Sequence, residues 1–212
     1  MSGWIWLVIT FVAWALFHSI TAARPVKRWV QRLLGERAYA GFYRFAYNVV
    51  ATLSFLPVLY VLAFCVPAAV VWRVQPPWTW PMMAVQVAGL VGLVASLLYT
   101  GAFSFLGLRQ VWRYLKGAPD PDPPVSFISS GPYALVRHPL YLFSLLALWF
   151  TPLLTANLLA FNLLATLYFW LGARHEERRL AAEFGEQYRR YQAQVPFLSP
   201  WPRPSRGPVS AG

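Results

Sequence analysis

The sequence predicts an all-α integral membrane protein with about five transmembrane helices, the last two forming a helical hairpin, plus an amphipathic C-terminal helix. Of the 212 residues, 58% are hydrophobic and 12% are charged, which is about half the charged share of a soluble domain. Four uncharged runs, at residues 3–23, 45–72, 82–108 and 140–173, are long enough as helices to cross the roughly 30 Å hydrocarbon core of a bilayer. This composition argues against a water-soluble enzyme. The small total of ionic groups argues against a nucleic-acid partner, despite a net charge of +11.

The first three runs each predict one helix. Basic residues follow the first run, beginning with Arg24, whereas a cleaved signal peptide carries them before its apolar stretch. We therefore expect a retained helix. The second run ends before Arg73 and the prolines that follow it. The third contains Gly89 and Gly92, small residues that allow close packing between helices.

The fourth run is too long for one span, because about 34 residues of helix extend for roughly 50 Å. Thr151 and Pro152 interrupt it, and a proline in a helix interior breaks or kinks the helix. We expect a tight hairpin of two helices over residues 140–173. One tilted helix with a kink at the proline is the alternative.

The basic residues predict the orientation. Lys and Arg accumulate in cytosolic loops, and they number six in residues 24–44, one in 73–81, four in 109–137 and seven in 174–206. Five crossings place the three basic segments in the cytosol, with the N-terminus outside, whereas four crossings do not. We therefore expect a protein of the bacterial inner membrane, embedded in the lipid bilayer, with a cytosolic C-terminus.

Polar side chains gather at the expected cytosolic ends of the last two helices. Arg137 and His138 precede Pro139, a residue that suits the first turn of a helix, and the free N–H groups of a helix N-terminus favour an anion. Glu176 and Glu177, two of only seven acidic residues, stand at the end of the last span. The hairpin would bring the two groups side by side, where a zwitterion with ribose hydroxyls finds complementary partners.

An apolar stripe follows on an otherwise charged helix. It consists of Leu180, Phe184, Tyr188 and Tyr191, spaced by four, four and three residues. We expect this amphipathic helix to lie along the membrane surface and to cover the site.

Two further polar sets are candidates for substrate binding, because polar residues inside a membrane are functional candidates by default. One set, Arg109 and Gln110, stands at the expected end of the third helix. The other lies where the chain turns from the first helix, with His18, to the start of the second helix. For the histidine in the second set, a structural hydrogen bond is the alternative. The candidates are Arg109, Gln110, His18, Arg44, Tyr47 and Asn48.

The motifs of soluble nucleotide-binding folds and of serine or zinc hydrolases are absent. With three scattered histidines and one cysteine, the sequence predicts no metal site.

The motifs of the C-terminal half occur in a specific order and spacing. They are Gly131-Pro132-Tyr133, Arg137-His138-Pro139-Leu140-Tyr141, Glu176-Glu177, Phe184-Gly185, Tyr188, Tyr191 and Val195-Pro196. This pattern resembles the membrane methyltransferases related to isoprenylcysteine carboxyl methyltransferase and the phospholipid methyltransferases. The resemblance implies S-adenosylmethionine as cofactor and methyl transfer, at the cytosolic face, to a small or lipophilic acceptor such as a thiol, a carboxylate or a lipid head group. It also implies cofactor contacts by Tyr133, Arg137, His138, Tyr141, Glu176 and Glu177.

The candidate catalytic residues are Arg137 and Arg109, either of which could face the incoming nucleophile. If the nucleophile is a thiol, a neighbouring guanidinium raises the fraction present as thiolate.

Other segments resemble related families. Residues 106–112 and 18–29 are similar to the bacterial methanethiol S-methyltransferases, and the first half, with His18-Ser19 and residues 43–48, resembles the NnrU-like membrane family, whose relatives include a haem-containing carotenoid isomerase. We expect a single membrane domain with an NnrU-like three-helix half over 1–108, a cofactor-binding half over 109–200 and a flexible tail over 201–212. The alternatives are a haem-binding NnrU-like protein or isomerase that uses His18, and a non-catalytic membrane factor.

Overall fold

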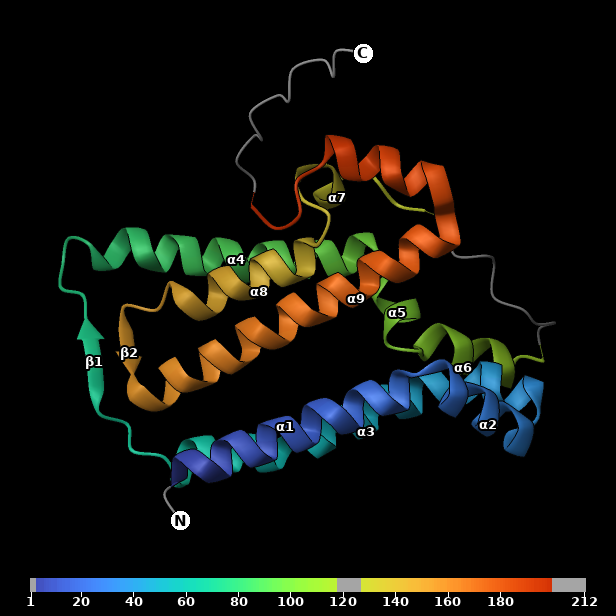
Figure 1. Cartoon of the computed structure of the whole chain (residues 1–212), viewed down its shortest axis with the longest axis horizontal. Coiled ribbons are helices and arrows are strands. Elements are labelled where there is room, and N and C mark those ends of the chain that lie inside the picture. The colour runs from blue at the N-terminus through green and yellow to red at the C-terminus, as the bar shows by residue number, and fades with distance from the viewer. Residues whose placement is uncertain (1–2, 118–126, 200–212) are drawn as a thin grey trace, which may run out of the picture.

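A computed structural model describes residues 3–117 and 127–199 and shows a bundle of long helices (Figure 1). The expected tail at 201–212 lies outside the described residues. The elements are α1 (Gly3–Ala22), α2 (Arg24–Leu34), α3 (Glu36–Phe64), β1 (Val70–Arg73), α4 (Thr79–Tyr99), α5 (Ala102–Phe105), α6 (Leu108–Leu115), α7 (Pro132–Leu135), α8 (Pro139–Trp149), β2 (Leu153–Thr155) and α9 (Ala156–Gln194).

The predicted fold class is confirmed. Four helices, α1, α3, α4 and α9, are long and apolar enough to cross a membrane, and α8 is a shorter apolar helix. Many of their large apolar side chains are exposed, among them Leu16, Leu53 and Leu98. In an all-helical membrane protein, such side chains face lipid rather than water.

The predicted division of the last apolar run is also confirmed. Helix α8 ends at Trp149, and α9 begins at Ala156 after the short strand β2. The two helices run in opposite directions (Figure 1), so the alternative of a single kinked helix is wrong. The reason is the strand itself, because three extended residues at 153–155 reverse the chain.

The strand pair was not predicted from the sequence. Strands β1 and β2 are antiparallel, with Val70 opposite Thr155 and Arg73 opposite Leu153. They lie at one end of the bundle, near the N-terminus, whereas α2 and α6 lie at the other (Figure 1). Strands of four and three residues, next to long apolar helices, leave no period-two pattern to detect.

Two packing layers hold the bundle together. Helices α1, α3 and α9 share a core around Leu7, Phe11 and Val58. Helix α4 packs closely on α8, because a Cβ added at Gly92 would lie 2.4 Å from the Phe143 ring and one at Gly89 would lie 2.8 Å from the backbone of α8. The close packing predicted from these glycines is therefore confirmed.

Several helix boundaries differ from the sequence prediction. Helix α3 begins at Glu36, nine residues before the uncharged run, because Gly35, with φ of 77°, separates it from α2. Helix α4 ends at Tyr99, and Gly101 and Gly107, both at positive φ, divide the following residues into α5 and α6. The expected amphipathic helix is the end of α9, and it is redirected at Gly185.

Candidate functional site

A buried ion pair joins the start of α8 to α9. The guanidinium of Arg137 donates from Nε to Oε1 of Glu177 at 2.6 Å and from Nη2 to Oε2 at 3.4 Å. The side chains are 6% and 12% exposed, respectively. Burying two charges is costly unless the remaining hydrogen bonds are made. Here Nη1 of Arg137 donates to the carbonyl oxygens of Gln192 and Val195 at 2.8 and 3.0 Å.

Glu177 receives further donors from the end of α9. The Tyr188 hydroxyl donates to Oε1 at 3.3 Å, and Nε2 of Gln192 donates to Oε2 at 3.2 Å. The turn at Gly185, with φ of 53° and ψ of −125°, brings both side chains back onto this carboxylate. The amphipathic end of α9 thus folds over the ion pair, and Tyr188 is almost fully buried.

The segment after α9 is fixed to the same place. The backbone N–H of Arg137 donates to the carbonyl oxygen of Pro196 at 2.9 Å, and the Tyr191 hydroxyl donates to the carbonyl oxygen of Tyr133 at 2.6 Å. Phe197 packs edge-on against the ring of His138, at 5.1 Å between centroids. The segment 132–138, the part of α9 from Glu177 to its end and the residues 195–197 therefore hold one another in place, and we call them the interlocked cap.

His138 is buried between the two glutamates. Its Nε2 lies 3.4 Å from Oε1 of Glu177, and its Nδ1 lies 3.7 Å from Oε2 of Glu176. Burial lowers the pKa of His138 below its ordinary value, although both carboxylates oppose that shift. The ring stacks on Tyr141. Burial, together with the charge of Glu176, raises the pKa of Tyr133 to about 12, so this hydroxyl stays protonated at neutral pH.

A cavity of about 740 Å³ lies between α1 and α9. At one end it is lined by Tyr141, Glu176 and Arg179, and along its length by apolar side chains of the two helices. The carboxylate of Glu176 is 37% exposed, with its Oε1 3.6 Å from Nη2 of Arg179. The two adjacent glutamates therefore differ. The carboxylate of Glu177 accepts hydrogen bonds from other parts of the protein, whereas that of Glu176 faces the cavity.

His18 lines the same cavity from α1. Its Nε2 lies 2.8 Å and its Nδ1 3.3 Å from the Tyr47 hydroxyl, and its ring stacks on Trp14 at 5.1 Å between centroids. The structural hydrogen bond considered for this histidine is thus present. The haem alternative gains no support from this geometry, because the hydroxyl of Tyr47 lies against both ring nitrogens.

The other substrate-binding candidates lie apart from this cavity. Nη1 of Arg44 and Nε2 of Gln110 donate to the carbonyl oxygen of Ser104, at 3.1 and 3.2 Å, and Nδ2 of Asn48 donates to that of Phe105 at 3.0 Å. Arg44 and Asn48 therefore fasten the α5 turn to α3, whereas Gln110 fastens it to α6.

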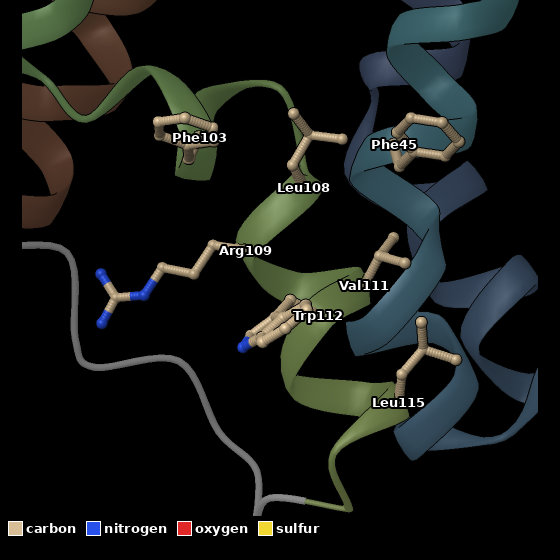
Figure 2. Close-up of a pocket in the computed structure, with 7 residues that line it drawn as sticks. All are labelled: Phe45, Phe103, Leu108, Arg109, Val111, Trp112 and Leu115. Atoms are coloured by element: carbon tan, nitrogen blue, oxygen red, sulfur yellow. The ribbon is translucent and has the colours of Figure 1, made fainter.

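Arg109 lines a second hollow, an apolar one of about 520 Å³ beside α6 (Figure 2). Its side chain points away from α3, whereas Val111 and Leu115 point toward that helix (Figure 2). The structure does not bring Arg109 together with Arg137, although the sequence suggested both as catalytic candidates.

Several cavity residues were absent from the sequence-based candidates. They are Ser19, Lys27, Tyr168, His175 and Arg179. In the sequence, Lys27 served only as a basic residue that indicates topology. Among residues 3–117 and 127–199 there is no group of three or more His, Cys, Asp or Glu side chains suited to a metal ion.

Comparisons with known proteins cover almost the whole chain. Residues 5–195 match the family described as "Protein of unknown function (DUF1295)". The chain is 33% identical over 201 residues to methanethiol S-methyltransferase 1 of Bradyrhizobium diazoefficiens, which covers 93% of this chain and 68% of that protein. It is 34% identical over 189 residues to methanethiol S-methyltransferase of Mycobacterium tuberculosis, covering 89% and 74%.

A relative from an animal matches as well. Nurim of Xenopus laevis is 30% identical over 199 residues, covering 92% of this chain and 65% of Nurim. No solved structure matches. Since the family match spans residues 5–195, the chain belongs to the DUF1295 family, and it is related to the bacterial methanethiol S-methyltransferases.

Proposed function

We propose that the protein is an S-adenosylmethionine-dependent methyltransferase that methylates a small thiol at the cytosolic face of a bacterial inner membrane. The relatives named methanethiol S-methyltransferase support the reaction and the class of acceptor. The observation that carries the proposal is the cavity between α1 and α9, which joins a charged end at Glu176 to an apolar interior.

The residues at the charged end fit the chemistry of the cofactor. Glu176 offers a carboxylate for an ammonium group, and Arg179, one turn along the helix, offers a guanidinium for a carboxylate. Tyr168 offers an aromatic ring, which attracts a cation such as a sulfonium. The volume of about 740 Å³ lies within the roughly 300–1,000 Å³ of small-molecule sites.

The bound cofactor supplies a methyl group already activated by its positive sulfur. The protein therefore has to hold the acceptor in line with that methyl group and to exclude water. Glu176 and Arg179 orient the amino-acid end of the cofactor, while apolar side chains of α1 and α9 keep water from the rest of the cavity.

The cofactor contacts inferred from the resemblance divide into two kinds. Glu176 and Tyr141 line the cavity directly. Tyr133, Arg137, His138 and Glu177 contribute to the interlocked cap and position those two residues. Because all three guanidinium nitrogens of Arg137 donate to protein oxygens, its geometry favours this positioning role over contact with the nucleophile. Contact of Arg109 with the acceptor stays a prediction.

The purified full-length protein in detergent tests the proposal. With methanethiol and a cofactor carrying an isotopically labelled methyl group, mass spectrometry should detect labelled dimethyl sulfide, and S-adenosylhomocysteine should inhibit its formation. If only a carboxylate or a lipid is labelled, the thiol acceptor is wrong. A Soret band in the protein as purified, lost in His18→Ala, would favour the haem alternative instead.

A further inference from the structure

The charged groups around the cavity are unequal in number. Among the described residues that line it, Glu176 is the one acidic side chain, whereas two are basic, Lys27 and Arg179. Arg179 is paired with Glu176. Among the described residues, Lys27 has no hydrogen bond or ion pair from its ammonium group, although the side chain is partly buried.

Lys27 comes from a different wall of the cavity. It lies on α2, directly after α1, and its backbone N–H donates to the carbonyl oxygen of Ala23 at 3.1 Å. Burial lowers the pKa of Lys27 below its ordinary value, and the nearby charges of Arg179, Arg44 and Arg24 lower it further. The charged and titratable groups around Lys27, on its own helix and on α1, α3, α8 and α9, are Arg24, His18, Arg44, Tyr141, Tyr168, His175, Glu176 and Arg179.

In the proposed complex, the charged groups of the cofactor pair with Glu176 and Arg179, so the ammonium group of Lys27 has no partner on the cofactor. The ammonium and carboxylate of an amino acid are attached to the same carbon atom, so their protein partners must be neighbours. Glu176 and Arg179 meet that requirement, because their charged atoms are 3.6 Å apart on successive turns of α9. Lys27, on the wall formed by α1 and α2, is then available for a second anion.

We propose that Lys27 binds the acceptor thiol in the cavity and holds it as a thiolate. This inference rests on the proposed function and identifies the residue that activates the nucleophile. In the transfer, the thiolate sulfur forms a bond to the methyl carbon while the bond from that carbon to the sulfonium sulfur breaks. The electron pair stays on the leaving sulfur, and the thiol proton goes to water at the mouth of the cavity.

An ammonium group is needed because the cavity is otherwise a poor place for a thiolate. Burial among apolar side chains raises the pKa of a thiol, whereas an opposite charge within about 4–6 Å lowers it by roughly 1–3 units. The uncharged thiol is the weaker nucleophile. Lys27 therefore sets the fraction of acceptor that can react at neutral pH.

The test is the variant Lys27→Met in the full-length protein, with methanethiol as acceptor and saturating cofactor. We expect the acid limb of the kcat profile to move up by at least about one pH unit, since loss of a nearby opposite charge has that size of effect. The rate at pH 7 should fall by about tenfold or more, because one unit of pKa is a tenfold change in thiolate. The affinity for S-adenosylhomocysteine should stay within about twofold, and Lys27→Arg should restore most of the rate.

Lys116→Met is the matched control, because Lys116 is the other lysine of the chain. It is exposed, lies over the Trp112 ring at 4.9 Å and does not line the cavity. Thermal unfolding of each variant shows whether it is folded, and Lys27→Gln replaces the methionine variant if that one does not fold.

Two results would overturn the inference. One is an unchanged pH profile in Lys27→Met. The other is a loss of S-adenosylhomocysteine affinity with no change in the profile, which would assign Lys27 to the cofactor carboxylate. Both leave wild-type thiol methylation intact, whereas absence of methylation by the wild type contradicts the proposed function itself.

Discussion

The carboxylate of Glu177, on α9, lies 2.6 Å from Nε of Arg137, just before α8 and at the end of the hairpin away from β2. Both side chains are largely buried. The pair connects the two halves of the hairpin where the polar motifs of the sequence meet. Its neighbour Glu176 faces the cavity instead. Two adjacent, chemically identical residues therefore have different tasks: one supports the architecture and the other is available to a ligand.

Replacement of Glu177 by Ala should destabilise the fold strongly. Removing one partner of a buried pair leaves an uncompensated charge and typically costs about 3–5 kcal/mol. Thermal unfolding in detergent, followed by intrinsic fluorescence, measures the effect. The control is Glu186→Ala, which removes an exposed pair with Arg189 and should cost about 0–1 kcal/mol. Equal effects of the two variants would contradict the role given to Glu177.

The turn at Gly185 should tolerate no side chain. Its φ of 53° and ψ of −125° are rarely adopted by other residues, and strain of this kind costs about 1–3 kcal/mol. An added Cβ meets no atom within 4 Å, so the loss of stability in Gly185→Ala reports on the backbone alone. Gly172→Ala, in the regular part of α9, should be neutral or stabilising by up to about 1 kcal/mol. A stable Gly185→Ala variant would show that the end of α9 does not need this turn.

Acid should destabilise the protein through His138. Burial lowers its pKa in the folded state from the ordinary 6.5, so the unfolded chain takes up a proton at a higher pH than the folded chain does. Stability is therefore complete above about pH 7 and declines as the pH falls through 6.5 toward the folded-state pKa. Melting temperatures between pH 7.5 and 5.5 should show this decline in the wild type and a shallower one in His138→Gln. Parallel curves would mean that His138 does not contribute to it.

Most of the fold could be predicted because lipid imposes simple rules. Uncharged runs located α1, α3, α4 and the hairpin, and the length of the last run together with Pro152 indicated where it divides. The strands and the Gly185 turn could not be predicted, since each depends on contacts between distant segments, such as Val70 with Thr155.

The candidate site was predictable in part. The motifs correctly grouped Arg137, His138 and the two glutamates, which the structure brings within hydrogen-bonding distance or close to it. The sequence could not say which glutamate faces the cavity, because that depends on rotation of α9 about its axis. Nor could it separate the arginines, because Arg109 is carried away on α6 by the positive-φ turn at Gly107. The division into an NnrU-like half and a cofactor-binding half stays a prediction.

Calorimetry with S-adenosylhomocysteine tests the central claim most directly, namely that the cavity binds the cofactor through Glu176. Wild-type protein in detergent should bind it, and Glu176→Gln should lose about tenfold or more in affinity, since a hydrogen bond to a charged group contributes about 1.5–3 kcal/mol. Glu183→Gln, an exposed position on the same helix outside the cavity, should bind like the wild type. Equal affinity of Glu176→Gln and the wild type would contradict the account.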